Sequence, residues 1–336
     1  CEPPIVEAAM RLIAHNEERF PKKIRAGKAG KQKVRFQYFE DCYKENAFLA
    51  EDIRQTVQNG VPLSEIAVLF RTNMQPRALM EYMVSANLAF QTKDRIPDIY
   101  EHWIARDFFT YIRIAQGSDS RADFLSIMNR PKRYIGRDSL PDETVCFDEW
   151  MKLYEEQPWI AERIEKLWYD LKHLSRLSPY AAINYIRRGI GYDDYLAEYA
   201  EYRNANKEDF YEVADEILAS AKGYRTFEEW FAHIEEYRQE LKRLAQEKRR
   251  NQNAVTFATL HSAKGLEFTK VYLIDVNEGV MPYKKAVLKQ DVEEERRLFY
   301  VGMTRAKESL TICSVKKMRG KEVELSRFIK EAGKEP

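Results

Sequence analysis

AVTFATLHSAKGLEFTKVYLIDV, from Ala254 to Val276, is the stretch that decides the fold prediction. It holds two short runs of β-branched and apolar residues, AVTFATLH (254–261) and KVYLIDV (270–276), on either side of a polar loop. A third run, SLTICSV (309–315), follows a helical pattern over 292–306. Short apolar runs that alternate with helical patterns are typical of buried parallel strands. The end of the chain is therefore predicted to be an α/β structure with a parallel sheet.

The beginning of the chain shows the same pattern, and the middle does not. VRFQYFE (34–40) and EIAVLFR (65–71) predict strands separated by a helix, whereas strand patterns vanish between Glu101 and Asn253. Because sequential βα units normally build one sheet, we predict one α/β domain interrupted by an all-α insert, with three independent segments as the alternative. The predicted boundaries are 1–100 and 253–336 for the two segments of the α/β domain and 101–252 for the insert.

The composition predicts a folded cytoplasmic protein. Of the 336 residues, 44% are hydrophobic and 32% are charged, enough for two or three domains with real cores. No run of about 18 apolar residues and no signal-peptide pattern occurs, so no membrane contact is expected. A net charge of +1 gives no overall attraction to nucleic acid. The four cysteines have no C-x-x-C spacing, so we expect neither a metal site nor disulfides.

The loop between the first two of these runs carries groups suited to a phosphate ligand. Thr259, His261, Lys264 and Gly265 bring a hydroxyl, an imidazole, an ammonium and backbone N–H groups to the carboxyl edge of a strand, where open α/β sheets bind ligands. Glu267 follows closely and could accept hydrogen bonds from ribose hydroxyls. The alternative is an ordinary β-turn in which His261 is packed and Lys264 is solvated.

EEERRLFYVGMTRAKESL, from Glu293 to Leu310, supplies a second polar element. Leu298, Gly302 and Arg305 are spaced so that they would share one face of a helix, and Gly302 would allow a close approach of a neighbour. The alternative pairs Arg305 and Arg297 with Glu293, Glu294 or Glu295 on a solvated helix surface. No G-x-x-x-x-G-K-[ST] loop occurs. The nearest candidate, GKAGKQK (27–33), lacks the closing Gly-Lys-Ser/Thr. The two elements therefore predict half of an ATP site, without its phosphate loop.

In this order and spacing, the sequence resembles the UvrD/Rep/PcrA-like superfamily 1 DNA helicases. TLHSAKGLEF (259–268) resembles the motif V of that family, and EEERRLFYVGMTRAK (293–307) its motif VI. EIAVLFRTNMQPRALMEYM (65–83) resembles the segment that delivers Arg-Thr-Asn beside the single strand, and PPIVEAAMRLIAHN (3–16) the helix after motif IV. The resemblance implies a C-terminal fragment: a RecA-like, P-loop-NTPase-type sheet domain (2A) that lacks the Walker A half, interrupted by an all-α inserted domain (2B).

The resemblance also implies roles for individual residues. Arg305 would be the catalytic arginine finger, and Glu267, with Gly265 and Lys264, would contact ATP. Arg71, Asn73, Thr259 and His261 would contact single-stranded DNA. The Mg²⁺ ligands and the Walker motifs would lie in an N-terminal motor domain absent from this chain, so the fragment alone would be inactive although its parent would be a 3′–5′ ATP-dependent helicase. Its partners would be single-stranded DNA, a single-strand/duplex junction, that motor domain and a repair protein bound through the insert.

Two departures from the family pattern leave alternatives open. QTKDRIPDIYEHW, from Gln91 to Trp103, lacks the Gly-Gly-x-x-Phe stretch that usually leads into the insert, and the insert is short, without a recognisable duplex-binding motif. A non-catalytic RecA-like adaptor that binds DNA or protein is one alternative, and the motor portion of a helicase-nuclease is another. The sequence leaves the choice between DNA and RNA open.

Overall fold

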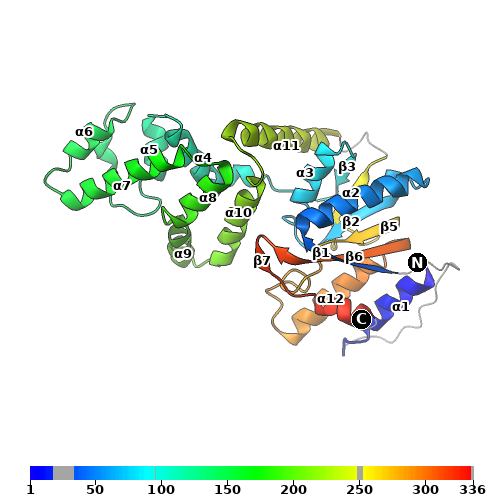
Figure 1. Ribbon diagram of the computed structural model, residues 1–336. Coiled ribbons are helices and arrows are strands. Elements are labelled where there is room, and N and C mark those ends of the chain that lie inside the picture. Colours follow the sequence, from blue (N-terminus) through cyan, green and yellow to red (C-terminus); the bar gives the residue numbers. More distant parts are fainter. Residues whose placement is uncertain (18–33, 95, 248–252, 334–336) are drawn as a thin grey trace. The chain divides into compact units, whose positions relative to one another are not determined.

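The computed structural model describes residues 1–17, 34–94, 96–247 and 253–333. GKAGKQK (27–33) therefore lies outside the described residues. The chain forms two compact units, one from Cys1–Pro97 together with Tyr237–Pro336 and the other from Asp98–Glu236 (Figure 1). The boundary on the C-terminal side falls within the helix α11 (Phe227–Glu247), sixteen residues ahead of the predicted start at 253. The two ends of the chain thus build one unit together.

The first unit contains a parallel sheet, as the apolar runs predict. The strand order is β1-β6-β5-β2-β4-β3, every neighbouring pair in that order is parallel, and β7 adds to β6 in the antiparallel direction. The strands are β1 (Arg35–Asp41), β2 (Ile66–Phe70), β3 (Phe90–Thr92), β4 (Val255–Thr259), β5 (Phe268–Leu273), β6 (Ala306–Met318) and β7 (Lys321–Glu322). Every residue of β2 and β4 is buried, which explains their continuous apolar sequences.

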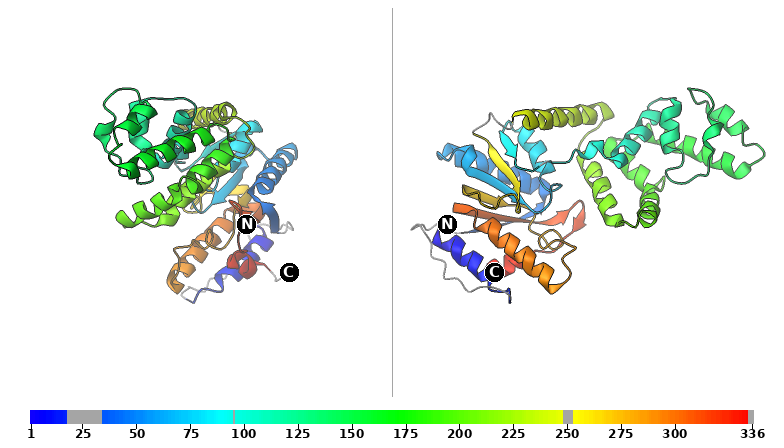
Figure 2. Two further views of the ribbon diagram at one scale, coloured as in Figure 1. Left: turned by 60° about the vertical axis from the view of Figure 1, so that its left-hand side comes forward. Right: turned by 180° about the vertical axis from the view of Figure 1, so that it is seen from behind.

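Helices cover both faces of this sheet. The α2 and α3 helices lie on one face, and α1, α12 and α13 lie on the other (Figures 1 and 2). Their bounds are α1 (Pro3–Ile13), α2 (Cys42–Gln58), α3 (Arg77–Ser85), α12 (Lys289–Met303) and α13 (Arg327–Ala332), with a 3₁₀ turn, η1, at Leu63–Glu65. Successive residues of β5 serve the two faces, because Tyr272 donates to Asp52 of α2 at 2.6 Å while Leu273 joins the core beneath α12.

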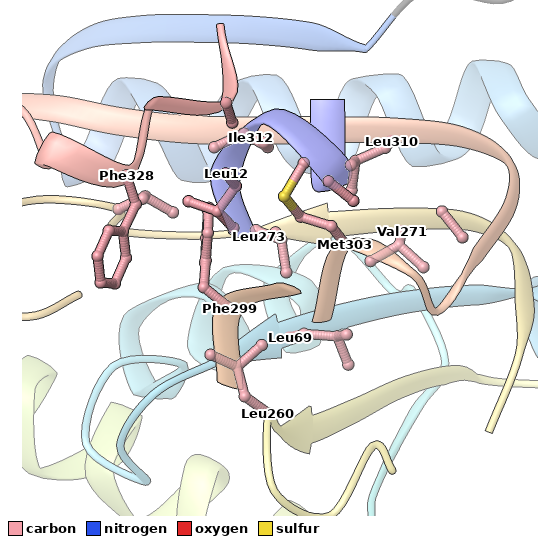
Figure 3. Packing of buried hydrophobic residues seen from close by; sticks show 14 of the residues in the cluster. Leu12, Leu69, Leu260, Val271, Leu273, Phe299, Met303, Leu310, Ile312 and Phe328 are labelled. Carbon is pink, nitrogen blue, oxygen red and sulfur yellow. The ribbon is translucent and has the colours of Figure 1, made fainter. Parts of the chain in front are cut away.

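The core beneath α1, α12 and α13 fixes the position of α12 on the sheet. Leu69, Val271 and Leu273 of the sheet pack with Phe299 and Met303 of α12, and Figure 3 shows these side chains converging. Burying a side chain of this size contributes about 1.5–3 kcal/mol to folding. The helix predicted over 292–306 ends earlier, at Met303, and β6 begins at Ala306. Arg305 therefore lies in the link between helix and strand, and its predicted place on the helix face is wrong.

The second unit is built from helices within its described residues. They are η2 (Ile99–Glu101), α4 (Trp103–Ala115), α5 (Arg121–Ile127), η3 (Arg137–Ser139), α6 (Phe147–Lys152), α7 (Pro158–Leu174), α8 (Pro179–Arg188), α9 (Tyr192–Tyr202), α10 (Lys207–Ser220) and the first part of α11. Buried Asp107 of α4 accepts from Arg130 at 2.7 and 2.9 Å and from the Tyr192 hydroxyl at 2.5 Å. The part of the chain that the structure describes holds no helix long and apolar enough to cross a membrane.

Candidate functional site

The link between β4 and β5 runs from one edge of the sheet to the other. Thr259 ends β4 in register with Phe70, the last residue of β2, whereas Phe268 begins β5 in register with Ala306, the first residue of β6. Because all these strands are parallel, residues 260–267 return from the carboxyl edge to the amino edge. The predicted place of Thr259 at the carboxyl edge is confirmed, whereas Glu267, at the far end of the link, lies at the opposite edge.

At the carboxyl edge, a carboxylate from another strand holds the start of this link. Asp94 accepts a hydrogen bond from the Thr259 N–H at 2.7 Å and another from the Ser262 hydroxyl. The Thr259 hydroxyl accepts from the Ser262 N–H at 3.1 Å. Thr259 is buried, and His261 beside it is exposed. The structure thus places His261 where a ligand could reach it, and assigns the Thr259 side chain a part in shaping the loop.

Arg71 lies at the same edge, directly after β2, and its guanidinium is paired. Its Nε and Nη2 donate to the carboxylate of Glu295, on α12, at 2.8–3.0 Å, and the guanidinium carbon lies 5.2 Å from the centre of the Tyr283 ring. Glu295 is buried and also accepts from the Tyr283 N–H at 3.1 Å. The sequence suggested Glu295 as a partner for Arg305 or Arg297, and the structure assigns it to Arg71 instead.

The backbone after Arg71 is held by a side chain that the sequence analysis missed. Gln75 accepts hydrogen bonds from the N–H groups of Arg71 and Thr72 at 2.8 and 2.7 Å, and its own amide donates to Ile274 at the end of β5. Asn73 lies within this turn, and its Oδ1 is buried without a hydrogen-bond partner among the described residues. Gln75 lies five positions after the end of β2, and a polar residue that soon follows a strand and faces N–H groups that have left the ladder is the signal that could have identified it.

At the amino edge, Arg305 and Glu267 lie beside each other. Arg305 donates from Nε to Val301 O at 2.9 Å, from Nη1 to Leu266 O at 3.1 Å, and from Nη2 to the Thr304 hydroxyl at 3.1 Å. The Phe268 N–H donates to Arg305 O at 2.9 Å, which starts the pairing of β5 with β6. Arg297 pairs with Glu294 at 2.9 Å and Glu293 at 3.4 Å. The solvated-surface alternative is therefore confirmed for Arg297 and wrong for Arg305.

Most of the rest of the link toward the amino edge is open to solvent. Glu267, Lys264 and Gly265 are exposed, and Gly265 has a φ of +85°, in the left-handed region that favours glycine. The Glu65 carboxylate, just before β2, accepts from the N–H and the hydroxyl of Thr269 at 3.1 and 2.6 Å and pairs with Lys307. The hydrogen bond from Lys307 lowers the pKa of Glu65. Glu65 thus joins the first residues of β2, β5 and β6, next to Glu267 and Arg305.

Gly302 connects α12 to the link between the strands. A Cβ at this position would lie 2.3 Å from Cδ2 of Leu260 and 3.3 Å from Cδ2 of Leu273. Real Cβ atoms do not approach other atoms so closely, so a side chain at 302 would force Leu260 or α12 to shift. The prediction that this glycine permits close packing against a neighbour is confirmed.

A buried acidic pair supports the carboxyl edge from within. Glu45 of α2 accepts from the Asp275 N–H at 3.3 Å, and the Cys42 thiol donates to Asp275 at 3.6 Å. Burial raises the pKa of Asp275, and burial together with the charge of Asp275 raises the pKa of Glu45. Their ligand atoms and the Cys42 sulfur lie within 4.8 Å of one another, a spacing that a cation could use. A proton held by the pair is sufficient to keep two carboxyl groups together in such dry surroundings.

Comparison with known proteins gives consistent matches. The family described as UvrD-like helicase C-terminal domain matches residues 1–142 and 161–317. The ATP-dependent DNA helicase PcrA of Staphylococcus epidermidis is 29% identical over 97% of this chain and 48% of its own length. The ATP-dependent DNA helicase Rep of Salmonella typhimurium is 27% identical over 97% of this chain and 52% of its own length. The chain therefore spans about half the length of these curated relatives.

A solved structure also aligns with part of the chain. It is the C-terminal domain of a possible DNA helicase from Lactobacillus plantarum WCFS1, with 26% identity, a TM-score of 0.19, and coverage of 31% of this chain and 58% of that one. The description of the fold rests on the sheet and helices above.

Proposed function

The chain belongs to the family of UvrD-like helicase C-terminal domains, and from that premise we propose that it is the second motor half of an ATP-dependent 3′–5′ DNA helicase or translocase. Residues 1–100 and 253–336 would form the RecA-like domain 2A, and 101–252 the inserted domain 2B. An N-terminal motor domain outside this chain would supply the Walker motifs and the ligands of Mg²⁺. Alone, the chain would not turn over ATP.

The link between β4 and β5 is the observation that carries this proposal. One end of the link, at Thr259, lies in register with Phe70 at the end of β2, which Arg71 follows, and the other end, at Phe268, lies in register with Ala306, which follows Arg305. A motor must convert events at a nucleotide into a change of grip on a strand. The link between β4 and β5 has one end at each of the two edges, so a movement of one end can shift the other directly.

The amino edge offers the chemistry of a nucleotide site that a second domain completes. Arg305 is held by two backbone carbonyls and a hydroxyl, all neutral acceptors. Its positive charge is therefore available for a γ-phosphate, and an arginine in that role accelerates phosphoryl transfer by about 10³ to 10⁵. Glu267 would accept from ribose hydroxyls, and Lys264 and the Gly265 backbone would contact the anion. When bound, Mg²⁺ would neutralise phosphate charge through the other domain.

The carboxyl edge offers a grip on single-stranded DNA. Glu295 occupies the Nε and Nη2 of Arg71, which leaves the Nη1 donors for a phosphate oxygen. His261 is exposed in the neighbouring loop, and Asn73 and Thr259 would help to shape the surface that meets the backbone of the strand. Contacts to phosphates and sugars hold a strand without reading its sequence.

The test is ATP turnover by the intact protein that carries this chain, measured with and without single-stranded DNA at fixed salt. We expect Arg305→Ala to lower DNA-stimulated turnover by about 10³ while DNA binding is retained. Absence of stimulated turnover in the unmodified protein, or unchanged turnover in the variant, would contradict the proposal and favour a non-catalytic adaptor.

A further inference from the structure

Asp94 is fixed in place by the sheet before it reaches the link that follows β4. Thr92, the last residue of β3, pairs with Phe257, and the Lys93 N–H donates to Phe257 O at 2.9 Å. The parallel pairing therefore continues past the end of β3 and brings residue 94 level with Thr259. The pairing of the backbone alone brings the half-buried Asp94 carboxylate within hydrogen-bond distance of Thr259 and Ser262.

The two oxygens of Asp94 bind two different donors. Oδ2 accepts from the Thr259 N–H at 2.7 Å, and Oδ1 accepts from the Ser262 hydroxyl. These two residues flank Leu260 and His261, so the carboxylate closes a small ring around the first turn of the link. Hydrogen bonds to an ionised acceptor contribute more to stability than hydrogen bonds between neutral groups. The position of exposed His261 thus depends on Asp94.

We propose that Asp94 is a positioning residue that holds the turn at Thr259–Ser262 in the geometry that grips single-stranded DNA. This inference rests on the proposed function and deepens it by naming the group that shapes the grip. Asp94 itself does not contact the strand, because a carboxylate repels phosphates. Its effect passes through the hydrogen bonds to Thr259 and Ser262.

Charge and hydrogen bonding predict opposite outcomes when Asp94 is replaced. Loss of a negative charge beside a strand, taken alone, tightens the binding of a polyanion. Loss of the two hydrogen bonds loosens the turn and weakens binding. Asp94→Ala removes the charge and both acceptors, whereas Asp94→Asn removes the charge and keeps one acceptor oxygen. The difference between these two variants therefore isolates the hydrogen bonds.

The experiment measures, in the intact protein at fixed salt, the Kd for a fluorescein-labelled oligothymidine and the ATP turnover with and without it. We expect Asp94→Ala to raise Kd about tenfold and lower DNA-stimulated turnover accordingly, with unstimulated turnover within about twofold. Asp94→Asn should recover part of the affinity. Glu324→Ala, which removes an exposed carboxylate elsewhere in the same unit, is the matched control and should bind like the unmodified protein.

Ser262→Ala keeps the test decisive if Asp94→Ala folds poorly, because it removes a hydroxyl from an exposed residue. It should raise Kd about threefold, and the double variant with Asp94→Ala should bind no more weakly than Asp94→Ala alone. Unchanged or tighter binding by Asp94→Ala, or full additivity with Ser262→Ala, would overturn the assignment of Asp94 and leave the proposed function standing. A parent protein that neither binds the strand nor is stimulated by it would overturn both.

Discussion

Arg305 and Arg71 lie at opposite edges of one sheet, and different kinds of acceptor hold their guanidinium groups. Arg305 donates to Val301 O, Leu266 O and the Thr304 hydroxyl, which are all neutral. Arg71 donates through Nε and Nη2 to the buried carboxylate of Glu295. The α12 helix serves both arginines, because Glu295 lies within it and Arg305 follows its last turn.

The difference fits the two tasks proposed for these arginines. Neutral acceptors orient a guanidinium without cancelling its charge, so Arg305 keeps its full attraction for a phosphate. A buried carboxylate pairs with the guanidinium of Arg71 through Nε and Nη2, so an ionic partner fixes the direction of its remaining donors. Hydrolysis of a nucleotide requires charge stabilisation at one point, whereas grip on a strand must be released at every step.

Lysine substitutions give the sharpest test of this comparison. Lysine retains the charge but loses the planar fork of donors. We expect Arg305→Lys to lower DNA-stimulated ATP turnover of the intact protein by about 10³, because the fork places the charge at the γ-phosphate. Arg71→Lys should change the Kd for single-stranded DNA by about threefold at most, since one phosphate contact can be replaced by an ammonium. Equal losses at the two positions would show that the kind of acceptor does not distinguish the two arginines.

A substitution at Gly302 tests whether α12 is a common support for both edges. Gly302→Ala brings a Cβ to 2.3 Å from Leu260 Cδ2, and overpacking of this kind costs about 1–3 kcal/mol of folding free energy. The measurement is hydrogen exchange of the β5 amides, since all five tryptophans lie in the second unit. Leu260→Ala relieves the clash, so the double variant should be less destabilised than the sum of the single variants. Full additivity would show that the two residues do not share this contact.

The sequence predicted the sheet more completely than the site, for a physical reason. The runs at 65–71 and 254–261 are buried on both faces, so burial alone selects their residues and reveals the strands. Partners such as Asp94 and Glu295 are polar residues whose roles arise from strands and helices far apart in sequence. Asp94 lies in the segment 91–103, where the absence of glycine marked an unusual connection without indicating which residue would act there.

The edge at which Glu267 lies could not be predicted, for a related reason. The residues of the link at 260–267 fit either edge of the sheet, and their order along the chain does not show that a short connection returns across a full strand length. Similarly, helical spacing placed Arg305 on the face of Leu298, whereas the helix stops at Met303 because Thr304 begins the link to β6. The spacing of apolar residues along the chain does not show at which residue a helix ends and the next strand begins.

Arg71→Ala and Glu295→Gln separate charge from position at the carboxyl edge. Arg71→Ala should weaken single-strand binding about tenfold and reduce the slope of log K against log salt by about 0.7, because one phosphate contact is lost. Glu295→Gln leaves the charge of Arg71 but removes its bidentate acceptor. We expect a smaller loss of affinity, with the salt slope retained. A steeper slope in Glu295→Gln would show that the carboxylate sets the charge of the grip as well as its direction.

Titration of the buried pair of Glu45 and Asp275 should have the smallest effect on ATP turnover, and it tests the carboxyl edge alone. Burial raises the pKa of both carboxyl groups, with the charge of Asp275 adding to the effect on Glu45. An acid whose pKa is higher in the folded state binds more protons there. Its contribution to stability is present below the unfolded pKa and is lost as pH rises through the folded pKa. Protection of the β5 amides should therefore fall with rising pH, by at most about 1.4 kcal/mol per pH unit for each proton.

Glu45→Gln should flatten this dependence, because an amide can accept from the Asp275 N–H without gaining a charge at high pH. Asp275 would then titrate with Arg319, Cys42 and Gln75 as its remaining neighbours, and the thiol of Cys313 would lose one nearby carboxylate. Glu51→Gln, at an exposed position on the same helix, is the matched control and should leave the dependence unchanged. We expect unstimulated ATP turnover of the intact protein, which is proposed to depend on the amino edge, to follow the same pH profile in both variants. A shift of that profile in Glu45→Gln alone would show that the two edges are not independent.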